Sequence, residues 1–163
     1  MNHRLSFAAA VLAGVTFLFV LAPTPAAADR LEFSRYGVRA GVSLDPEQFV
    51  LGVYAGFGEL ARNLSVRPSA DLGFGDNVTT LVLNGDLQYS FRDTDWSGVP
   101  YVGGGIALSY FNFDGGGDDT GIGLNAYAGI ERSLADYTSG HLEARLGFDE
   151  VPEFKLIAGF GFY

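Results

Sequence analysis

The stretch Leu64-Ser-Val-Arg-Pro-Ser-Ala-Asp-Leu-Gly-Phe74 decides how this chain folds, because its eleven residues alternate in character almost without exception. Every second residue is apolar, and the residues between them are small, polar or charged. Side chains of a β-strand point alternately to two faces, so the stretch predicts a strand that separates an apolar environment from a polar one. Pro68 lies on the apolar face and cannot donate a ladder hydrogen bond, so we expect a β-bulge there.

The same alternation recurs seven more times between residue 35 and the C-terminus. These runs cover residues 35–43, 49–57, 81–91, 102–110, 122–131, 141–148 and 154–163. Turn-forming residues separate them at 45–47, 58–59, 75–77, 93–98, 114–119, 135–136 and 150–152. An even number of strands lets an antiparallel meander close without a free edge. The sequence therefore predicts an all-β fold, an eight-stranded antiparallel up-and-down β-barrel.

The first 28 residues have the plan of a secretory signal peptide. A positively charged start that contains Arg4 precedes the apolar run 5–21, and small residues end the segment at Ala28. Pro23 and Pro25 disfavour a membrane-anchor helix that would continue this run. Cleavage after Ala28 would leave residues 29–163, a single domain of 135 residues.

Composition excludes several classes of protein. After removal of the signal peptide, 9 basic residues face 19 acidic ones, which argues against nucleic-acid binding. The chain has no cysteine, so it has neither disulfides nor thiolate metal sites. Its 23 glycines show no Gly-X-Y period, and its many aromatic and aliphatic residues argue against disorder.

We call the set of side chains that one strand directs to one face a stripe. The absence of charged residues from the apolar stripes indicates which face of the barrel points outward. None of the eight predicted apolar stripes contains a charged residue, and aromatic residues gather near the stripe ends. Arg or Lys facing lipid at mid-bilayer costs about 2–4 kcal/mol, and aromatic girdles mark membrane interfaces. We therefore predict a transmembrane barrel with its apolar face outward. A soluble periplasmic lipocalin-like ligand-binding barrel, with the opposite polarity, is the alternative.

The signal peptide, the eight stripes and the final Gly159-Phe-Gly-Phe-Tyr163 resemble the outer-membrane β-barrel family that includes OmpA-like and opacity-type surface proteins. The resemblance covers essentially all of the mature chain. It implies a location in the bacterial outer membrane, contact with lipid and lipopolysaccharide, and recognition by the barrel-assembly machinery. In that family a C-terminal aromatic residue serves as assembly signal, a role that falls here to Tyr163, although Gly161 stands where an apolar residue is usual.

The predicted inward face carries charges of both signs. The charged residues are Arg39, Arg67, Asp71, Asp86, Glu143, Arg145 and Lys155. Four basic and three acidic groups can pair inside a narrow lumen, where isolated charges would be costly. We expect a salt-bridged polar network that plugs the lumen, with a narrow porin-like channel as the alternative.

Catalysis has one candidate cluster, Ser139, His141 and Glu143. A hydrolase relay needs the acid to orient the histidine and the histidine to activate the serine. Alternate residues of one strand point the same way, which gives no reason for relay geometry. The spacing also differs from the His-x-Ser arrangement of lipid A deacylase barrels. We therefore predict no enzyme activity and no cofactor, and a structural or surface-interaction role.

The predicted surface loops are short and acidic. Their carboxylates belong to Asp45, Glu47, Asp76, Asp114, Asp118, Asp119, Asp149 and Glu150. The plain interpretation is a solvated acidic rim. The alternative is that these loops bind Ca²⁺ or Mg²⁺, which prefer oxygen ligands, and bridge to lipopolysaccharide phosphates. The stretch 114–119 matches no complete calcium-loop motif.

Overall fold

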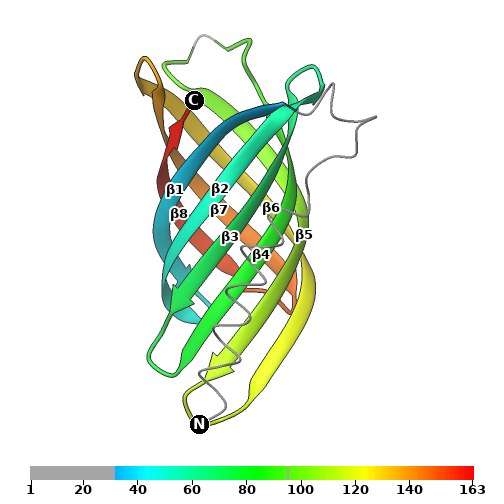
Figure 1. Ribbon diagram of the computed structural model, residues 1–163, viewed down its shortest axis with the longest axis vertical. Coiled ribbons are helices and arrows are strands. Elements are labelled where there is room, and N and C mark those ends of the chain that lie inside the picture. Colours follow the sequence, from blue (N-terminus) through cyan, green and yellow to red (C-terminus); the bar gives the residue numbers. More distant parts are fainter. Residues whose placement is uncertain (1–31, 95) are drawn as a thin grey trace.

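The computed structural model describes residues 32–94 and 96–163, which form a closed barrel of eight antiparallel strands in chain order (Figure 1). The strands are β1 (Phe33–Leu44), β2 (Glu47–Ala61), β3 (Leu64–Phe74), β4 (Val78–Ser90), β5 (Val99–Phe113), β6 (Asp118–Ala135), β7 (Thr138–Asp149) and β8 (Phe154–Phe162). The predicted fold class is confirmed. The predicted signal peptide, residues 1–28, lies outside the described residues.

Closure depends on the pairing of the first strand with the last. Residues Tyr36–Ser43 of β1 pair with Lys155–Phe162 of β8, and every other strand pairs with its neighbours in sequence. The ladder therefore has no open edge. Within residues 32–94 and 96–163, no helix is long and apolar enough to cross a membrane.

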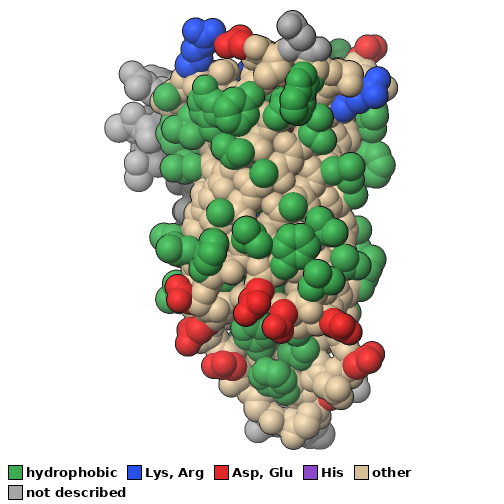
Figure 2. Space-filling view, turned by 180° about the vertical axis from the view of Figure 1, so that it is seen from behind, with side chains coloured by type: hydrophobic (Ala, Val, Ile, Leu, Met, Phe, Trp, Pro, Cys, Tyr) green, Lys and Arg blue, Asp and Glu red, His purple; other side chains and the backbone are tan. Residues whose placement is uncertain are grey.

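The two faces of the wall have the predicted polarity. On β1, Val38 is 50% exposed and its neighbour Arg39 only 3%. Large apolar side chains on the other strands, such as Leu146 and Phe160, also face outward. On the face seen in Figure 2, hydrophobic side chains gather in two bands with a barer belt between them. This is the polarity of a transmembrane barrel and the reverse of the lipocalin-like alternative.

Two strands depart from the predicted pattern because they are longer. The run predicted for 122–131 is part of β6, which continues to Ala135. Its outward stripe then includes Arg132, an exposed side chain two residues after Ile130. On β2, which begins at Glu47, that exposed acid likewise shares the outward face with Phe49. The prediction that all outward stripes are free of charge is therefore wrong for β2 and β6. A charge near the end of a strand costs little, because it lies close to the membrane interface.

The expected bulge at Pro68 is also absent. Pro68 pairs with Gly85 of β4 in an unbroken register. On the other side, β3 keeps one register with β2 from Phe74 through Val66, although the pairing lapses opposite Ala55 and Gly56. Pro68 has no N–H to donate, and the flanking pairs hold the register across this gap. The irregularities of this strand pair lie between Phe57 and Ala61 instead.

The barrel has two unlike ends. The terminal mouth carries Phe33, Tyr163 and the connections β2–β3, β4–β5 and β6–β7. The acidic mouth carries the connections β1–β2, β3–β4, β5–β6 and β7–β8. Of the predicted acidic loop residues, Asp45, Asp76, Asp114 and Glu150 lie in these connections, and Glu47, Asp118, Asp119 and Asp149 lie at the adjoining strand ends. In Figure 2, acidic side chains ring the lower end, whereas the basic side chains in view gather at the upper end.

Candidate functional site

The structure places all seven predicted charged residues inside the barrel. Each is at most 3% exposed: Arg39, Arg67, Asp71, Asp86, Glu143, Arg145 and Lys155. They come from β1, β3, β4, β7 and β8, and strand alternation directs every one of them inward. Because the barrel is narrow, inward residues of distant strands reach one another across the lumen.

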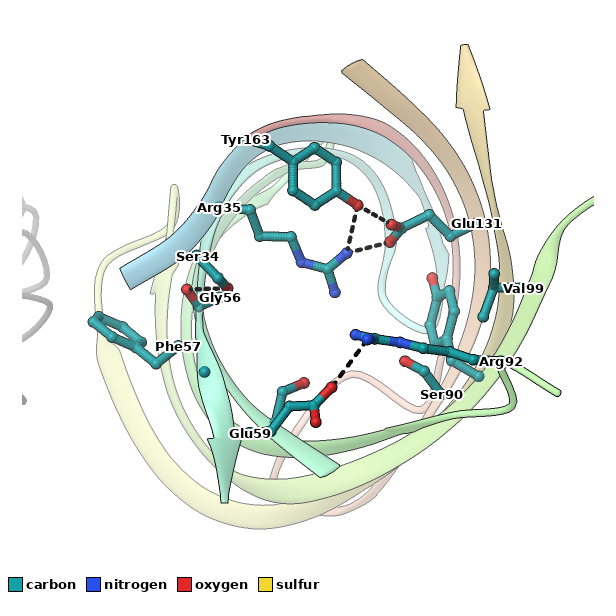
Figure 3. A pocket seen from close by; sticks show the side chains of 13 residues that line it. Ser34, Arg35, Gly56, Phe57, Glu59, Ser90, Arg92, Val99, Glu131 and Tyr163 are labelled. Atoms are coloured by element: carbon teal, nitrogen blue, oxygen red, sulfur yellow. Dashed lines mark hydrogen bonds and ion pairs between the residues drawn. The ribbon is translucent and has the colours of Figure 1, made fainter. Parts of the chain in front are cut away.

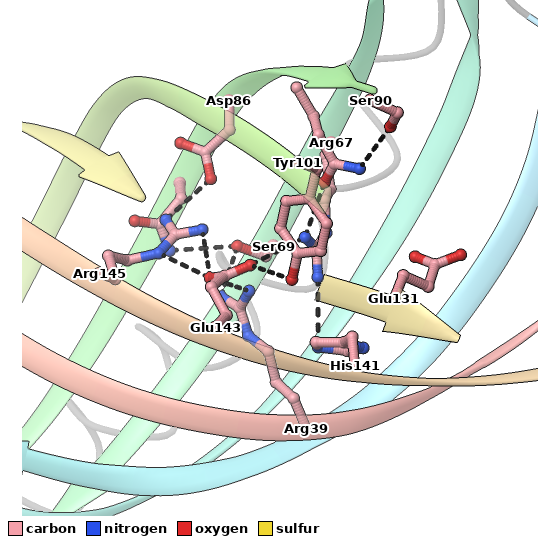
Figure 4. Close-up of polar contacts among 12 residues, drawn as sticks. Arg39, Arg67, Ser69, Asp86, Ser90, Tyr101, Glu131, His141, Glu143 and Arg145 are labelled. Carbon is pink, nitrogen blue, oxygen red and sulfur yellow. Dashed lines mark hydrogen bonds and ion pairs between the residues drawn. The ribbon is translucent and has the colours of Figure 1, made fainter. Parts of the chain in front are cut away.

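Glu143 lies at the centre of these contacts (Figure 4). Its carboxylate accepts hydrogen bonds from Arg67 Nη1 at 2.9 Å, from Tyr101 Oη at 3.1 Å and from Arg145 Nε at 3.1 Å. Arg39 Nη1 lies 3.9 Å from the same carboxylate. One acid from β7 thus links arginines of three strands.

The two other carboxylates extend the network. Asp71 accepts two hydrogen bonds of 2.8 Å from Arg39 and lies 3.4 Å from Lys155 Nζ. Asp86 accepts a hydrogen bond of 2.8 Å from Arg145 Nη1. All seven side chains therefore belong to one connected set of ion pairs, which we call the central network. Pairing of this kind offsets the high cost of removing charge from water.

Neutral polar side chains add further hydrogen bonds, although Arg39 Nη1, Arg67 Nε and Arg145 Nη2 have no hydrogen-bond partner among the described residues. Arg67 donates to Gln88 Oε1 at 2.8 Å, and Arg39 donates to Ser69 Oγ at 2.7 Å. Asn125 Nδ2 donates to Asp86 at 2.9 Å. Gln88 of β4 and Asn125 of β6 are both buried in the lumen, where they reach side chains of other strands.

Three tyrosines are part of the same site, although the sequence did not single them out. Tyr54, Tyr101 and Tyr127 are buried in the lumen. Arg67 Cζ lies 4.3 Å from the ring centroid of Tyr54, and Arg145 Cζ lies 4.3 Å from that of Tyr127. These are cation–π distances. Aromatic faces thus hold two of the arginines that Glu143 links.

Each of these tyrosines lies against a glycine of the neighbouring strand. The paired residues are Tyr54 with Gly37, Tyr101 with Gly129, and Tyr127 with Gly103. A Cβ atom on any of the three glycines would collide with the opposing ring. Glycine is therefore required here by close approach. In the sequence, such a pair could be recognised as an inward tyrosine opposite an inward glycine, but only if the register of the two strands were known.

The candidate catalytic cluster does not form a relay. Ser139 and His141 share the inward face of β7 with Glu143, yet Ser139 Oγ has no hydrogen-bond partner among the described residues. His141 Nε2 lies 3.4 Å from Arg67 Nη2, and its ring packs edge-on against Tyr54 at 5.3 Å. The histidine is held by the central network instead of by the serine.

The terminal mouth contains a cavity of about 430 Å³ (Figure 3). Arg35 and Glu131 form an ion pair of 2.5 Å on its wall, and Tyr163 Oη donates to Glu131 at 2.5 Å. Tyr163, the predicted assembly signal, therefore turns toward the lumen. The outward aromatic residue at the end of β8 is Phe162, whose ring lies 5.5 Å from that of Tyr36.

An apolar residue occupies the lumen at the acidic mouth. Val151, from the turn between β7 and β8, is 6% exposed and packs with Val82 and Ala107. The turn is held in place by Ser109, whose hydroxyl donates to the carbonyl oxygen of Glu150. This small cluster lies at the opposite end of the lumen from the cavity.

The acidic side chains around this mouth are mostly solvent-exposed. Within the part of the chain that the structure describes, no three His, Cys, Asp or Glu side chains are grouped to hold a metal ion.

Comparisons with known proteins identify the fold. No protein-family model matches the chain, and no curated protein matches it. Among solved structures, the chain is similar to the N-terminal β-barrel domain of Pseudomonas aeruginosa OprF, with a TM-score of 0.63, 19% identity, and coverage of 78% of this chain and 96% of that one. It is also similar to Neisserial surface protein A, with a TM-score of 0.59, 18% identity, and coverage of 78% and 92%.

A third similar structure is the Yersinia pestis outer membrane protein Ail, with a TM-score of 0.51, 13% identity, and coverage of 80% of this chain and 99% of that one. At these identities the likeness concerns the fold. The chain has the fold of the small outer-membrane β-barrels.

Proposed function

We propose that the mature chain is an integral protein of the bacterial outer membrane, with a closed lumen and a structural or surface-interaction role. The main support is the combination of an apolar outer wall with a buried, charge-paired interior. Apolar surface that encircles the whole molecule is disfavoured in water and favoured in lipid. The likeness of fold to outer-membrane proteins agrees with this proposal.

The central network supports the closed lumen. Its ion pairs join β1, β3, β4, β7 and β8 across the interior, and the tyrosines fill the space beside them. A conducting pore would need a continuous path of water through this layer. Val151 and its neighbours present a second, apolar layer at the acidic mouth.

The test has two parts. Protein refolded into lipid bilayers should migrate differently on a gel before and after boiling, and should fractionate with membranes. Planar-bilayer recording of the same material should show no steady single-channel steps. A protein that remains in the aqueous phase would refute the membrane location. Steady conductance steps would refute the closed lumen and favour the narrow channel.

A further inference from the structure

A groove of about 590 Å³ lies on the outer wall near the terminal mouth, where β1, β8, β7 and β6 run side by side. Its small residues are Ala40, Gly140 and Ala158, and its larger apolar residues are Ile130, Leu142 and Phe160. Ala40 and Ala158 are direct partners on adjacent strands, so their short side chains leave a trough between bulkier neighbours. The groove is thus a depression in an otherwise apolar surface.

Arg132 lies at the edge of this groove. It points outward between Ile130 and Leu134, and no other lysine or arginine of the described chain lies on the outer face of a strand. No carboxylate of residues 32–94 and 96–163 forms an ion pair with it. Because the neighbouring surface is apolar and the strand end lies close to the membrane interface, this charge is available to an anionic group from outside the barrel.

We propose that the groove binds an acyl chain of an anionic phospholipid, whose phosphate pairs with Arg132. The proposal rests on the membrane location proposed above, and it assigns the lipid to the leaflet around the terminal mouth. An arginine side chain extends along apolar surface and presents its charged end at the headgroup level. The trough accepts a flexible hydrocarbon chain, which gains contacts with surfaces on both sides.

The charges at the two ends of the barrel support this choice of occupant. Arg62 and Arg92 also lie at the terminal mouth, where they pair with Asp93 and Glu59, whereas the turns of the acidic mouth contain no basic residue. The acidic mouth therefore repels anionic headgroups, whereas the terminal mouth offers them Arg132, the one cation of residues 32–94 and 96–163 that forms no ion pair. A second copy of the chain is a poorer occupant, because two-fold contact through this groove would bring the two Arg132 side chains together.

The experiment uses the refolded protein in micelles that contain equal amounts of phosphatidylglycerol and phosphatidylcholine. Native mass spectrometry would measure which lipid remains bound. We expect phosphatidylglycerol to be retained in preference, and Arg132→Gln to reduce this preference about fivefold, the ratio expected for one arginine at an anionic headgroup. Arg62→Gln, which removes a charge at the same mouth but away from the groove, should leave the preference unchanged.

A second pair of variants tests the trough. Ala158→Phe fills it and should reduce the retention of both lipids, since the acyl chain loses its site. Ala55→Phe adds the same ring to the outer face of β2, away from the groove, and should retain lipid as the parent does. Heat-modifiable gel mobility would establish that each variant is folded.

Four results would overturn the inference. Folded protein that retains neither lipid would overturn it and leave the membrane location intact. If Arg132→Gln and Arg62→Gln reduced the preference for phosphatidylglycerol equally, the preference would arise from a general attraction of charge and not from a specific site. A dimer in the mass spectrum that Ala158→Phe abolishes would assign the groove to a second copy. Protein that does not enter bilayers would overturn both this inference and the proposed function.

Discussion

The central network and the terminal mouth contain ion pairs of similar length in very different surroundings. Arg145 and Asp86 lie 2.8 Å apart with side chains 2% and 0% exposed, whereas Arg92 and Glu59 lie 3.0 Å apart with side chains 61% and 42% exposed. Exposed pairs contribute little, because water and salt screen them and the side chains lose freedom. Breaking a buried pair is costly, because an uncompensated charge remains behind. The comparison teaches that burial, more than distance, sets the energetic weight of these contacts.

The largest effect should come from Glu143→Gln. The substitution keeps the shape of the side chain but leaves Arg39, Arg67 and Arg145 with one carboxylate fewer in a dry lumen. We expect the free energy of unfolding to fall by about 3–5 kcal/mol. Urea unfolding of protein refolded in bilayers measures this change. Glu59→Gln at the terminal mouth is the control, with an expected loss within about 0.5 kcal/mol. Equal losses of unfolding free energy for Glu143→Gln and Glu59→Gln would contradict the expectation that buried ion pairs matter more than exposed ones.

Gly103→Val should sharpen the comparison by disturbing the central network without changing its charge. The new side chain would collide with Tyr127, whose ring lies beneath Arg145. We expect a destabilisation of about 1–3 kcal/mol from overpacking. Gly85→Val is the matched control, since a Cβ there meets no atom within 4 Å on the outer face of β4. The same unfolding measurement applies, and equal behaviour of both variants would show that the Tyr–Gly pairs carry no specific packing.

Val151→Ala tests the acidic mouth as a third kind of environment, apolar and free of ion pairs. The change removes buried methyl groups from the cluster with Val82 and Ala107. We expect the free energy of unfolding to fall by about 1–2 kcal/mol, because less apolar surface is removed from water on folding and a cavity is left behind. Val38→Ala, on the exposed outer wall, is the control for generic loss of a valine. Urea unfolding of both variants in detergent or bilayers measures the change. A larger loss of unfolding free energy for Val38→Ala than for Val151→Ala would show that the lipid-facing valine contributes more to stability than the buried one.

The smallest effect should come from Tyr163→Phe at the terminal mouth. This variant removes the hydroxyl that donates to Glu131 but keeps the aromatic ring. We expect a loss below about 1 kcal/mol in unfolding free energy, since Glu131 keeps its partner Arg35. Refolding yield should also stay near that of the parent, because Phe162 keeps its outward position at the end of β8. Phe162→Ala is the comparison variant, and a greater loss of yield from Tyr163→Phe would contradict this assignment.

The period of two in the sequence was sufficient to predict the barrel. Each predicted run falls in a strand except for its last residue in two cases, Phe91 after β4 and Tyr163 after β8. The agreement arises because alternation requires one apolar and one polar environment on the two sides of an extended chain. The seven charged residues of the lumen were also identified, because alternation alone fixes which face each residue takes. The bulge predicted at Pro68 is absent, because a residue without an N–H donor removes one ladder hydrogen bond without having to shift the register.

The tertiary structure decided everything that depends on which strands meet across the lumen. Glu143 is bonded to arginines of other strands, and the glycine opposite each luminal tyrosine is known only from the register. The inward turn of Tyr163 and the outward position of Arg132 both arise at strand ends, where patterns in sequence are weakest. Alternation is a local property of the chain. Barrel closure and strand stagger set the distances between residues far apart in sequence, and these required the folded structure.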